Sequence, residues 1–132
     1  MKFAKKIHVI ICDDVREEKN NKFSLMGVYG HKMIFERLPA RLPKLCIVLM
    51  LEGVKEKFSK IIITLALPNN KPLVFERPGS PEGIIGKNLN YIVHFSPFNV
   101  KKIGEAKIEM RFDNAKRPNY IHRFKIEEMK ES

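Results

Sequence analysis

The chain has 132 residues, of which 44% are hydrophobic, and it carries two cysteines. This length and apolar content predict one globular domain with a core of its own, and they exclude a disordered chain. Two cysteines are too few for a disulfide framework and lack the close spacing of a zinc site, so they predict buried free thiols in a reducing compartment.

We expect no secretory or lipoprotein signal in the first residues. Lys2, Lys5 and Lys6 precede an apolar stretch that is too short, and Asp13 and Asp14 follow it at once. The longest apolar run is also far shorter than the roughly 18 residues that a membrane-spanning helix needs. We therefore expect a cytoplasmic protein with no membrane contact.

Seven or eight segments of the chain have the short apolar patterns of strands. In chain order they are residues 5–15, 23–35, 44–52, 60–67, 72–76, 88–96, 104–113 and 120–126. Residues 5–15 are apolar on both faces, as in a central strand, and residues 72–76 fit a short edge strand. Residues 127–132 are expected to be a polar tail.

Glycine and proline mark the places where regular pairing is expected to change. Gly27 and Gly30 predict a bulge or a close backbone approach within residues 23–35. Two prolines in residues 38–43 each remove a backbone donor, so we expect an extended crossing from one sheet to another there.

No run of eleven or more residues shows the apolar period of a helix. We therefore predict an all-β fold, namely an antiparallel β-sandwich of seven to eight strands in a single domain over residues 1–132. Its expected topology is immunoglobulin-like or a related Greek key, and a barrel is the alternative.

The opening of the chain resembles that of a known family. Residues 12–17 read Cys-Asp-Asp-Val-Arg-Glu, residues 21–29 read Asn-Lys-Phe-Ser-Leu-Met-Gly-Val-Tyr, and Leu38-Pro39 follows. This opening is similar to an uncharacterised family of small bacterial and phage-type β proteins, which carry Cys-Asp-x-Val-Arg, then Lys-x-Ser-Leu-x-Gly-Val, then a Pro-rich crossing. The resemblance covers about the first third of the chain. It implies a β-sandwich of unknown function and brings no catalytic residue.

One acidic cluster follows the first predicted strand: Asp13, Asp14, Glu17 and Glu18. The first three carboxylates can hold calcium or magnesium, with a further oxygen from Asn20 or Asn21, because these cations prefer several oxygen ligands. The spacing matches no known calcium loop. The alternative is structural: Asp13 or Asp14 accepts backbone donors in the turn or pairs with Arg16.

Nothing else in the sequence resembles an organised active site. The four histidines share no ligand spacing, and no serine elbow or phosphate-binding loop is present. A nucleophile pair of Cys12 or Cys46 with a histidine is conceivable, but nothing in the sequence places such residues together. His122 lies on the apolar row of the last strand, where a half-buried side chain is expected. We predict a protein that is not an enzyme and has no cofactor.

Basic residues are the remaining signal, because the formal net charge is +10. The candidates for nucleic-acid contact flank the Pro-rich crossing and the last hairpin: Arg37, Arg41, Lys44, Lys101, Lys102, Lys116, Arg117 and Arg123. With Phe98 or Tyr120 they can bind phosphates and stack bases. The alternative is a solvated surface, since the charge is spread along the chain.

The leading interpretation is a non-enzymatic interaction or structural module whose partner is a protein or a second copy of the chain, with an exposed edge strand as one route to oligomers. A nucleic-acid-binding module is the first alternative. A divalent-metal-binding domain centred on residues 13–18 is the second.

Overall fold

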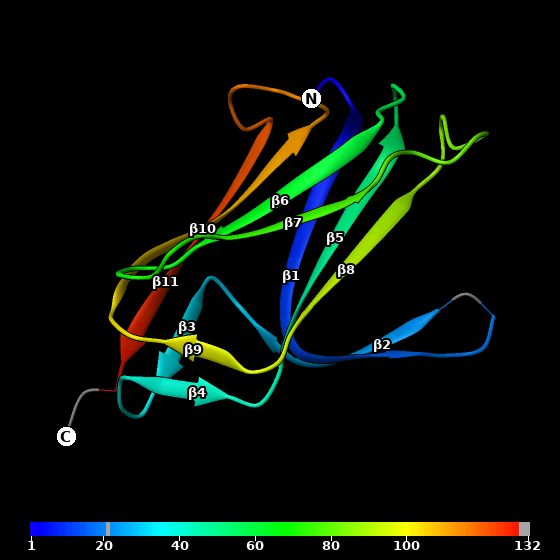
Figure 1. Ribbon diagram of the computed structural model, residues 1–132. Coiled ribbons are helices and arrows are strands. Elements are labelled where there is room, and N and C mark those ends of the chain that lie inside the picture. Colours follow the sequence, from blue (N-terminus) through cyan, green and yellow to red (C-terminus); the bar gives the residue numbers. More distant parts are fainter. Residues whose placement is uncertain (21, 130–132) are drawn as a thin grey trace.

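The computed structural model describes residues 1–20 and 22–129, and its regular structure consists of strands (Figure 1). The strands are β1 (Ala4–Glu17), β2 (Phe23–Tyr29), β3 (Lys32–Phe35), β4 (Ala40–Leu42), β5 (Leu45–Val54), β6 (Lys60–Ala66), β7 (Leu73–Pro78), β8 (Leu89–Phe95), β9 (Phe98–Val100), β10 (Gly104–Phe112) and β11 (Tyr120–Glu128). The all-β prediction is confirmed, whereas the predicted number of seven to eight strands is wrong. Within the described ranges, no helix is long and apolar enough to cross a membrane.

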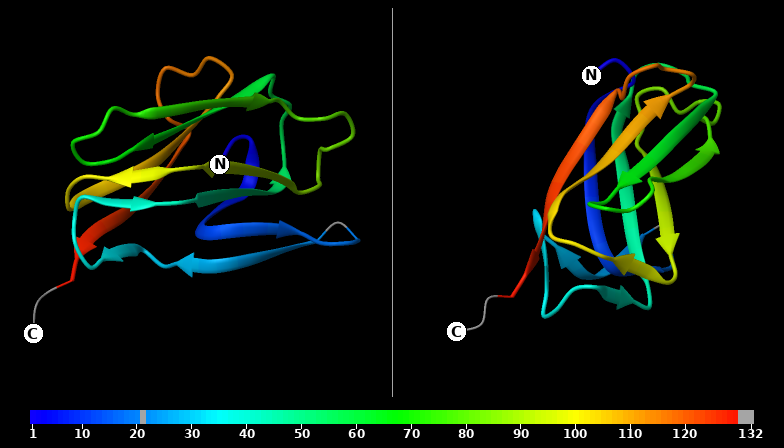
Figure 2. Two further views of the ribbon diagram at one scale, coloured as in Figure 1. Left: turned by 60° about the horizontal axis from the view of Figure 1, so that its bottom comes forward. Right: turned by 60° about the vertical axis from the view of Figure 1, so that its left-hand side comes forward.

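Two larger sheets lie in two layers, and a short ribbon closes one end (Figures 1 and 2). The first sheet has the order β2-β1-β5-β8, the second has the order β3-β11-β10-β6-β7, and β4 pairs with β9 in the ribbon. Neither larger sheet closes on itself as the barrel alternative requires. Neighbouring strands are antiparallel except β3 and β11, which are parallel. The antiparallel prediction therefore fails at one edge of the second sheet.

The core lies between the two larger sheets and follows the alternation of the sequence. In β10, for example, Ala106, Ile108, Met110 and Phe112 are buried, and the residues between them face solvent. In β8, Tyr91, Val93 and Phe95 are buried in the same way. The remaining core side chains come from both larger sheets, from β9 and from connecting segments, which supply Phe3, Phe58 and Leu67.

The chain between Phe23 and Phe35 was expected to be one strand, and it is two. β2 pairs with β1 in the first sheet, and after a break at Gly30 and His31 β3 pairs with β11 in the second sheet. Figure 2 (left) shows β2 and β3 in line along one border of the molecule. One stretch of chain therefore supplies an edge strand to both sheets.

Two other predicted boundaries differ from the structure. The Pro-rich crossing contains β4, because Ala40–Leu42 finds a partner in β9. The last strand continues through Glu128, because β11 pairs with β3 as far as that residue, so Glu127 and Glu128 are not a free tail. Residues 130–132 of the predicted tail lie outside the described residues.

The second half of β1 and β2 form a hairpin, residues 13–29, which we call the arm. β1 pairs with β5 as far as Cys12, and it pairs with β2 from Ile11 onward. Gly27 has a φ of 65°, and a Cβ there would overlap the Asp13 carboxylate, which confirms the predicted close approach at this glycine. The arm packs apolar side chains on the outer face of its own sheet.

Candidate functional site

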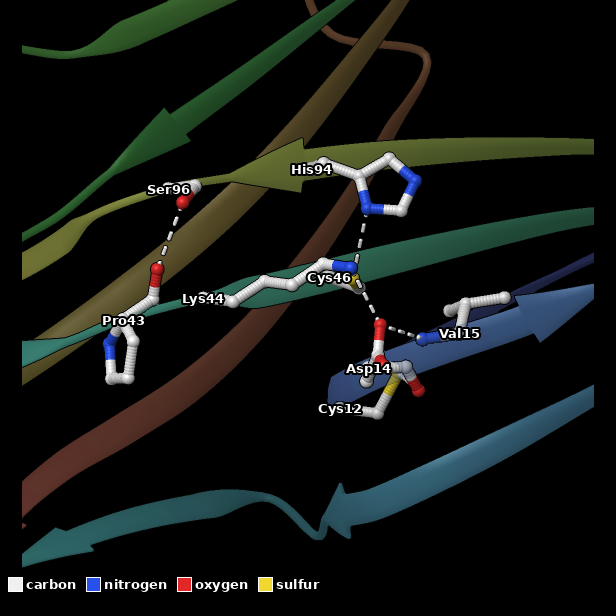
Figure 3. A network of polar contacts seen from close by, with 8 residues as sticks. All are labelled: Cys12, Asp14, Val15, Pro43, Lys44, Cys46, His94 and Ser96. Carbon is white, nitrogen blue, oxygen red and sulfur yellow. Dashed lines mark hydrogen bonds and ion pairs between the residues drawn. The ribbon is translucent and has the colours of Figure 1, made fainter.

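Strand register brings a cysteine and a histidine together on the outer face of the first sheet. Cys12 lies opposite Cys46 on β5, and Cys46 lies opposite His94 on β8. The Sγ of Cys46 is 3.1 Å from Nδ1 of His94 (Figure 3). The sequence could not place such a pair, because the residues are 48 positions apart and only the register of β5 and β8 joins them.

The thiols of Cys12 and Cys46 are both buried, and this burial limits the reactivity of Cys46 beside His94. Val15, Phe23 and Leu25 of the arm pack against Cys12 and Cys46, which are fully buried. Burial raises the pKa of both thiols, although the nearby Lys44 opposes this at Cys46. The neutral thiol is a poor nucleophile, so the arrangement favours packing over covalent catalysis.

The reactivity of the two thiols tests this burial. We expect Ellman's reagent to modify Cys12 and Cys46 at least about 100-fold more slowly in the folded protein than in denaturant, since access needs opening of the arm. Native thiols that react as fast as those of an unfolded chain would contradict the packing of the arm over the sheet.

Two carboxylates of the acidic cluster, Asp13 and Asp14, are bonded to protein groups. Lys44 Nζ donates to Asp14 Oδ1 at 2.6 Å, and the Val15 backbone N–H donates to the same oxygen at 2.9 Å (Figure 3). The Lys44 contact lowers the pKa of Asp14, and Asp14 in turn raises the pKa of Lys44. The Tyr29 hydroxyl donates to Asp13 Oδ1 at 2.7 Å. These contacts support the structural interpretation of the cluster.

The predicted metal ligands do not gather around one point. Asp13 bonds to Tyr29, Asp14 bonds to Lys44, and Glu17 lies exposed at the end of β1. Among residues 1–20 and 22–129, no three His, Cys, Asp or Glu side chains are grouped so that they can hold a metal ion. Asn21, one of the two predicted additional ligands, lies outside the described residues.

The eight predicted nucleic-acid contacts do not share one surface. Lys44 is held by Asp14, and Arg123 donates to Glu105 at 2.7 Å. Lys116 and Arg117 lie in the turn between β10 and β11, at the end of the molecule that holds the N-terminus (Figure 1). The remaining four lie in the β4–β9 ribbon or next to it, at the opposite end: Arg37, Arg41, Lys101 and Lys102.

An open groove of about 1010 Å³ lies beside β3 and β11. Three large apolar side chains line it although they face solvent: Ile34 is 57% exposed, Ile103 61% and Met129 55%. Lys32, Glu36 and Glu127 are among the charged residues around them. An apolar cluster rimmed by charges is typical of an interaction site. Sequence reasoning missed it, because three distant segments supply the three apolar residues.

The groove borders an open strand edge. The carbonyls of His31 and Phe35 accept from Lys125 and Met129, so alternate residues of this stretch turn their backbone groups toward β11. Lys32 and Ile34 therefore direct their N–H and C=O groups away from the sheet, where β3 is the last strand. Their side chains are exposed, whereas Met33 and Phe35 are buried.

His122 is half-buried, as predicted, and burial lowers its pKa. A histidine whose pKa is lower in the folded than in the unfolded chain binds protons more readily when unfolded, so stability falls as the pH drops below about 6.5. We expect the Tm of the wild type to fall more between about pH 7.5 and about pH 5 than that of His122→Gln. Equal pH profiles would show that His122 is accessible to protons in the fold.

Comparison with known proteins gives a family and no function. The profile of a family described as "Family of unknown function (DUF6941)" matches residues 8–121. Searches of curated proteins and of solved structures found no significant match. The resemblance to an uncharacterised family is thus confirmed, and the match extends far beyond the opening, while the bacterial and phage-type origin and the opening motif stay predictions. Because the profile covers most of the sequence, the chain belongs to this family of unknown function, DUF6941.

Proposed function

We propose that the chain is a non-enzymatic interaction module that binds an extended strand of a protein partner at the open edge of β3. One observation carries the proposal: the exposed apolar side chains of Ile34, Ile103 and Met129 lie beside backbone groups of β3 that pair with no strand in the described part of the chain. A docked strand satisfies these groups and covers the apolar side chains at the same time.

The chemistry of the edge supports a strand over other ligands. Lys32 and Ile34 offer main-chain donors and acceptors at the spacing of a β-ladder, and a groove beside them accepts alternate side chains. Glu36 and Glu127 also line the groove, which disfavours nucleic-acid phosphates there. The non-enzymatic part of the proposal is supported by the burial of the Cys46 thiol beside His94.

We also infer an immunoglobulin-like arrangement of seven of the strands. Its support is the order β1-β5-β8 in one sheet and β11-β10-β6-β7 in the other, which follows the A-B-E and G-F-C-C′ orders of that topology. β3 then corresponds to an extra edge strand beside the last strand. A cytoplasmic location remains a proposal, supported by the two free buried cysteines.

A peptide of residues 30–37, Gly-His-Lys-Met-Ile-Phe-Glu-Arg, is a suitable strand probe because it carries the exposed and buried alternation of β3. We expect the fluorescent peptide to bind the protein with a Kd on the order of 100 µM, which corresponds to a binding free energy of about −5.5 kcal/mol. The same peptide with an N-methyl group on the Ile34 amide lacks one donor and is the matched control. Equal binding of both peptides, or of neither, would contradict strand docking.

A nucleic-acid-binding module is the second candidate, and one observation favours it. Arg37, Arg41, Lys101 and Lys102 cluster around the β4–β9 ribbon, and in the described part of the chain no ion pair joins them to a carboxylate. We expect any such binding of labelled oligonucleotides to weaken about 100-fold or more between about 50 and about 200 mM salt. No binding at the lower salt would remove this candidate.

A further inference from the structure

We propose that the strand docked on β3 is β3 of a second copy of this chain, in the antiparallel register that places Ile34 opposite Ile34 of the second copy. This inference rests on the proposed function and names its partner. It makes the chain a symmetric dimer in which the second sheets of the two copies join edge to edge.

The outward residues of β3, together with Glu36 directly after it, form a self-complementary sequence. Lys32, Ile34 and Glu36 are all exposed and line the same groove, with a positive charge, an apolar side chain and a negative charge in that order. When two such strands run antiparallel about a two-fold axis at Ile34, Lys32 of each copy faces Glu36 of the other. Opposite charges that face each other across a strand pair are stabilising, whereas like charges are destabilising.

The backbone is compatible with the same register. When a second strand pairs antiparallel with β3, two residues that face each other can exchange two N–H···O=C hydrogen bonds. They do so only if the backbone groups of both residues point away from their own sheets. Pairing Ile34 with Ile34 of the second copy meets this condition, since its backbone groups point away from β11. A slip of two residues along one strand places Ile34 opposite Lys32 or Glu36 and leaves an apolar side chain facing a charge.

The surroundings of β3 suit a second copy. Ile103 and Met129 lie in the same groove as Ile34, so the two-fold axis brings together two exposed apolar clusters. Lys32 pairs with Glu127 at 3.6 Å, and both side chains are partly exposed, which leaves the ammonium group able to turn toward a partner carboxylate. The sum of these contacts is an isologous interface with an apolar centre and a charged rim.

The net charge of +10 on each copy opposes association over long distances, so the dimer is expected to be weak and is best measured near physiological salt. Sedimentation velocity over about 5–500 µM protein in about 150 mM salt covers the range of a transient interface. We compare the wild type with Lys32→Glu, Glu36→Lys and the double variant that carries both changes. Lys125→Glu is the matched control, because Lys125 is the exposed neighbour of Lys32 on β11, one strand in from the edge.

The expected result is a wild-type dimer, a Kd raised about 10- to 30-fold in each single variant, and a Kd in the double variant that returns to within about 3-fold of the wild type. Lys125→Glu is expected not to weaken the dimer. A Tm measured for each variant confirms that the fold is intact. A dimer whose Kd is the same in the wild type and in the charge variants would overturn the proposed register.

The outcomes also separate this inference from the proposed function. A wild-type chain that stays monomeric at every concentration overturns the second-copy inference, while binding of the residue 30–37 peptide would still support strand docking at β3. A monomeric chain that also fails to bind the peptide overturns both.

Discussion

Phe112→Ala is expected to lower the free energy of unfolding by about 3–5 kcal/mol, the range measured when a buried phenylalanine is truncated. Phe112 is 1% exposed, stacks on Phe3 with ring centroids 4.5 Å apart, and meets the edge of Phe58 at 4.8 Å. These rings join the segment before β1, the segment before β6 and the end of β10, which lie far apart in the sequence. Truncation of the central ring therefore leaves a cavity that neighbouring backbone cannot easily fill.

Urea unfolding followed by circular dichroism measures this loss. Phe112→Leu is the matched control, because it keeps most of the apolar volume, and we expect it to cost less than half as much as the alanine variant. A loss below about 1 kcal/mol for Phe112→Ala would show that the aromatic cluster does not hold these segments together.

Ile34→Glu is expected to raise the Kd of self-association at least about 100-fold. The change removes an apolar side chain from each side of the two-fold axis, at about 1.5–3 kcal/mol for each, and each 1.4 kcal/mol corresponds to a factor of ten. It also places two carboxylates opposite each other. The folded monomer is expected to keep its stability within about 0.5 kcal/mol, because Ile34 is 57% exposed.

Val74→Glu is the matched control for this change. Val74 lies on β7, the edge strand on the opposite side of the same sheet, and is 62% exposed. The two variants therefore make similar changes of charge and apolar surface at two different edges. An equal effect of both on the Kd, measured by sedimentation, would mean that the contact between copies does not use β3.

Local pattern was sufficient to predict most strands of this fold. β8 and β10 lie within two of the predicted strand segments, and the structure buries alternate apolar residues in each of them. The short segment near residues 72–76 was predicted as an edge strand, and β7 is one. Such predictions succeed because successive side chains of a strand point to opposite faces of the sheet. Apolar residues at every second position therefore indicate which face is buried.

Pairing between distant segments could not be predicted in the same way. β3 leaves the sheet of β2 and joins β11, although no change in apolar pattern separates the two strands, and only Gly30 marked the place. β4 is a strand because β9 pairs with it, despite prolines on both sides. These assignments depend on partners that lie about 60 to 90 residues away, so local propensity carries little information about them.

The candidate sites show the same limit. The structural interpretation of Asp13 and Asp14 was available from the sequence, yet Tyr29 and Lys44 as their partners follow from strand pairing. The proximity of Cys46 and His94 depends on the register of β5 and β8. The groove beside β3 could not be predicted from the sequence, because Ile34, Ile103 and Met129 lie far apart in the chain and only the fold brings them together.

Amide hydrogen exchange by NMR tests the central claim, that the open edge of β3 receives a strand, most directly. We expect the amides of Lys32 and Ile34 to exchange more slowly at about 500 µM protein than at about 20 µM, because docking turns free N–H groups into hydrogen-bonded ones. The amides of β7, the other edge of the same sheet, are expected to exchange at the same rate at both concentrations. Exchange at Lys32 and Ile34 that does not change while the chain associates would contradict the account, because it would place the contact between copies on another surface.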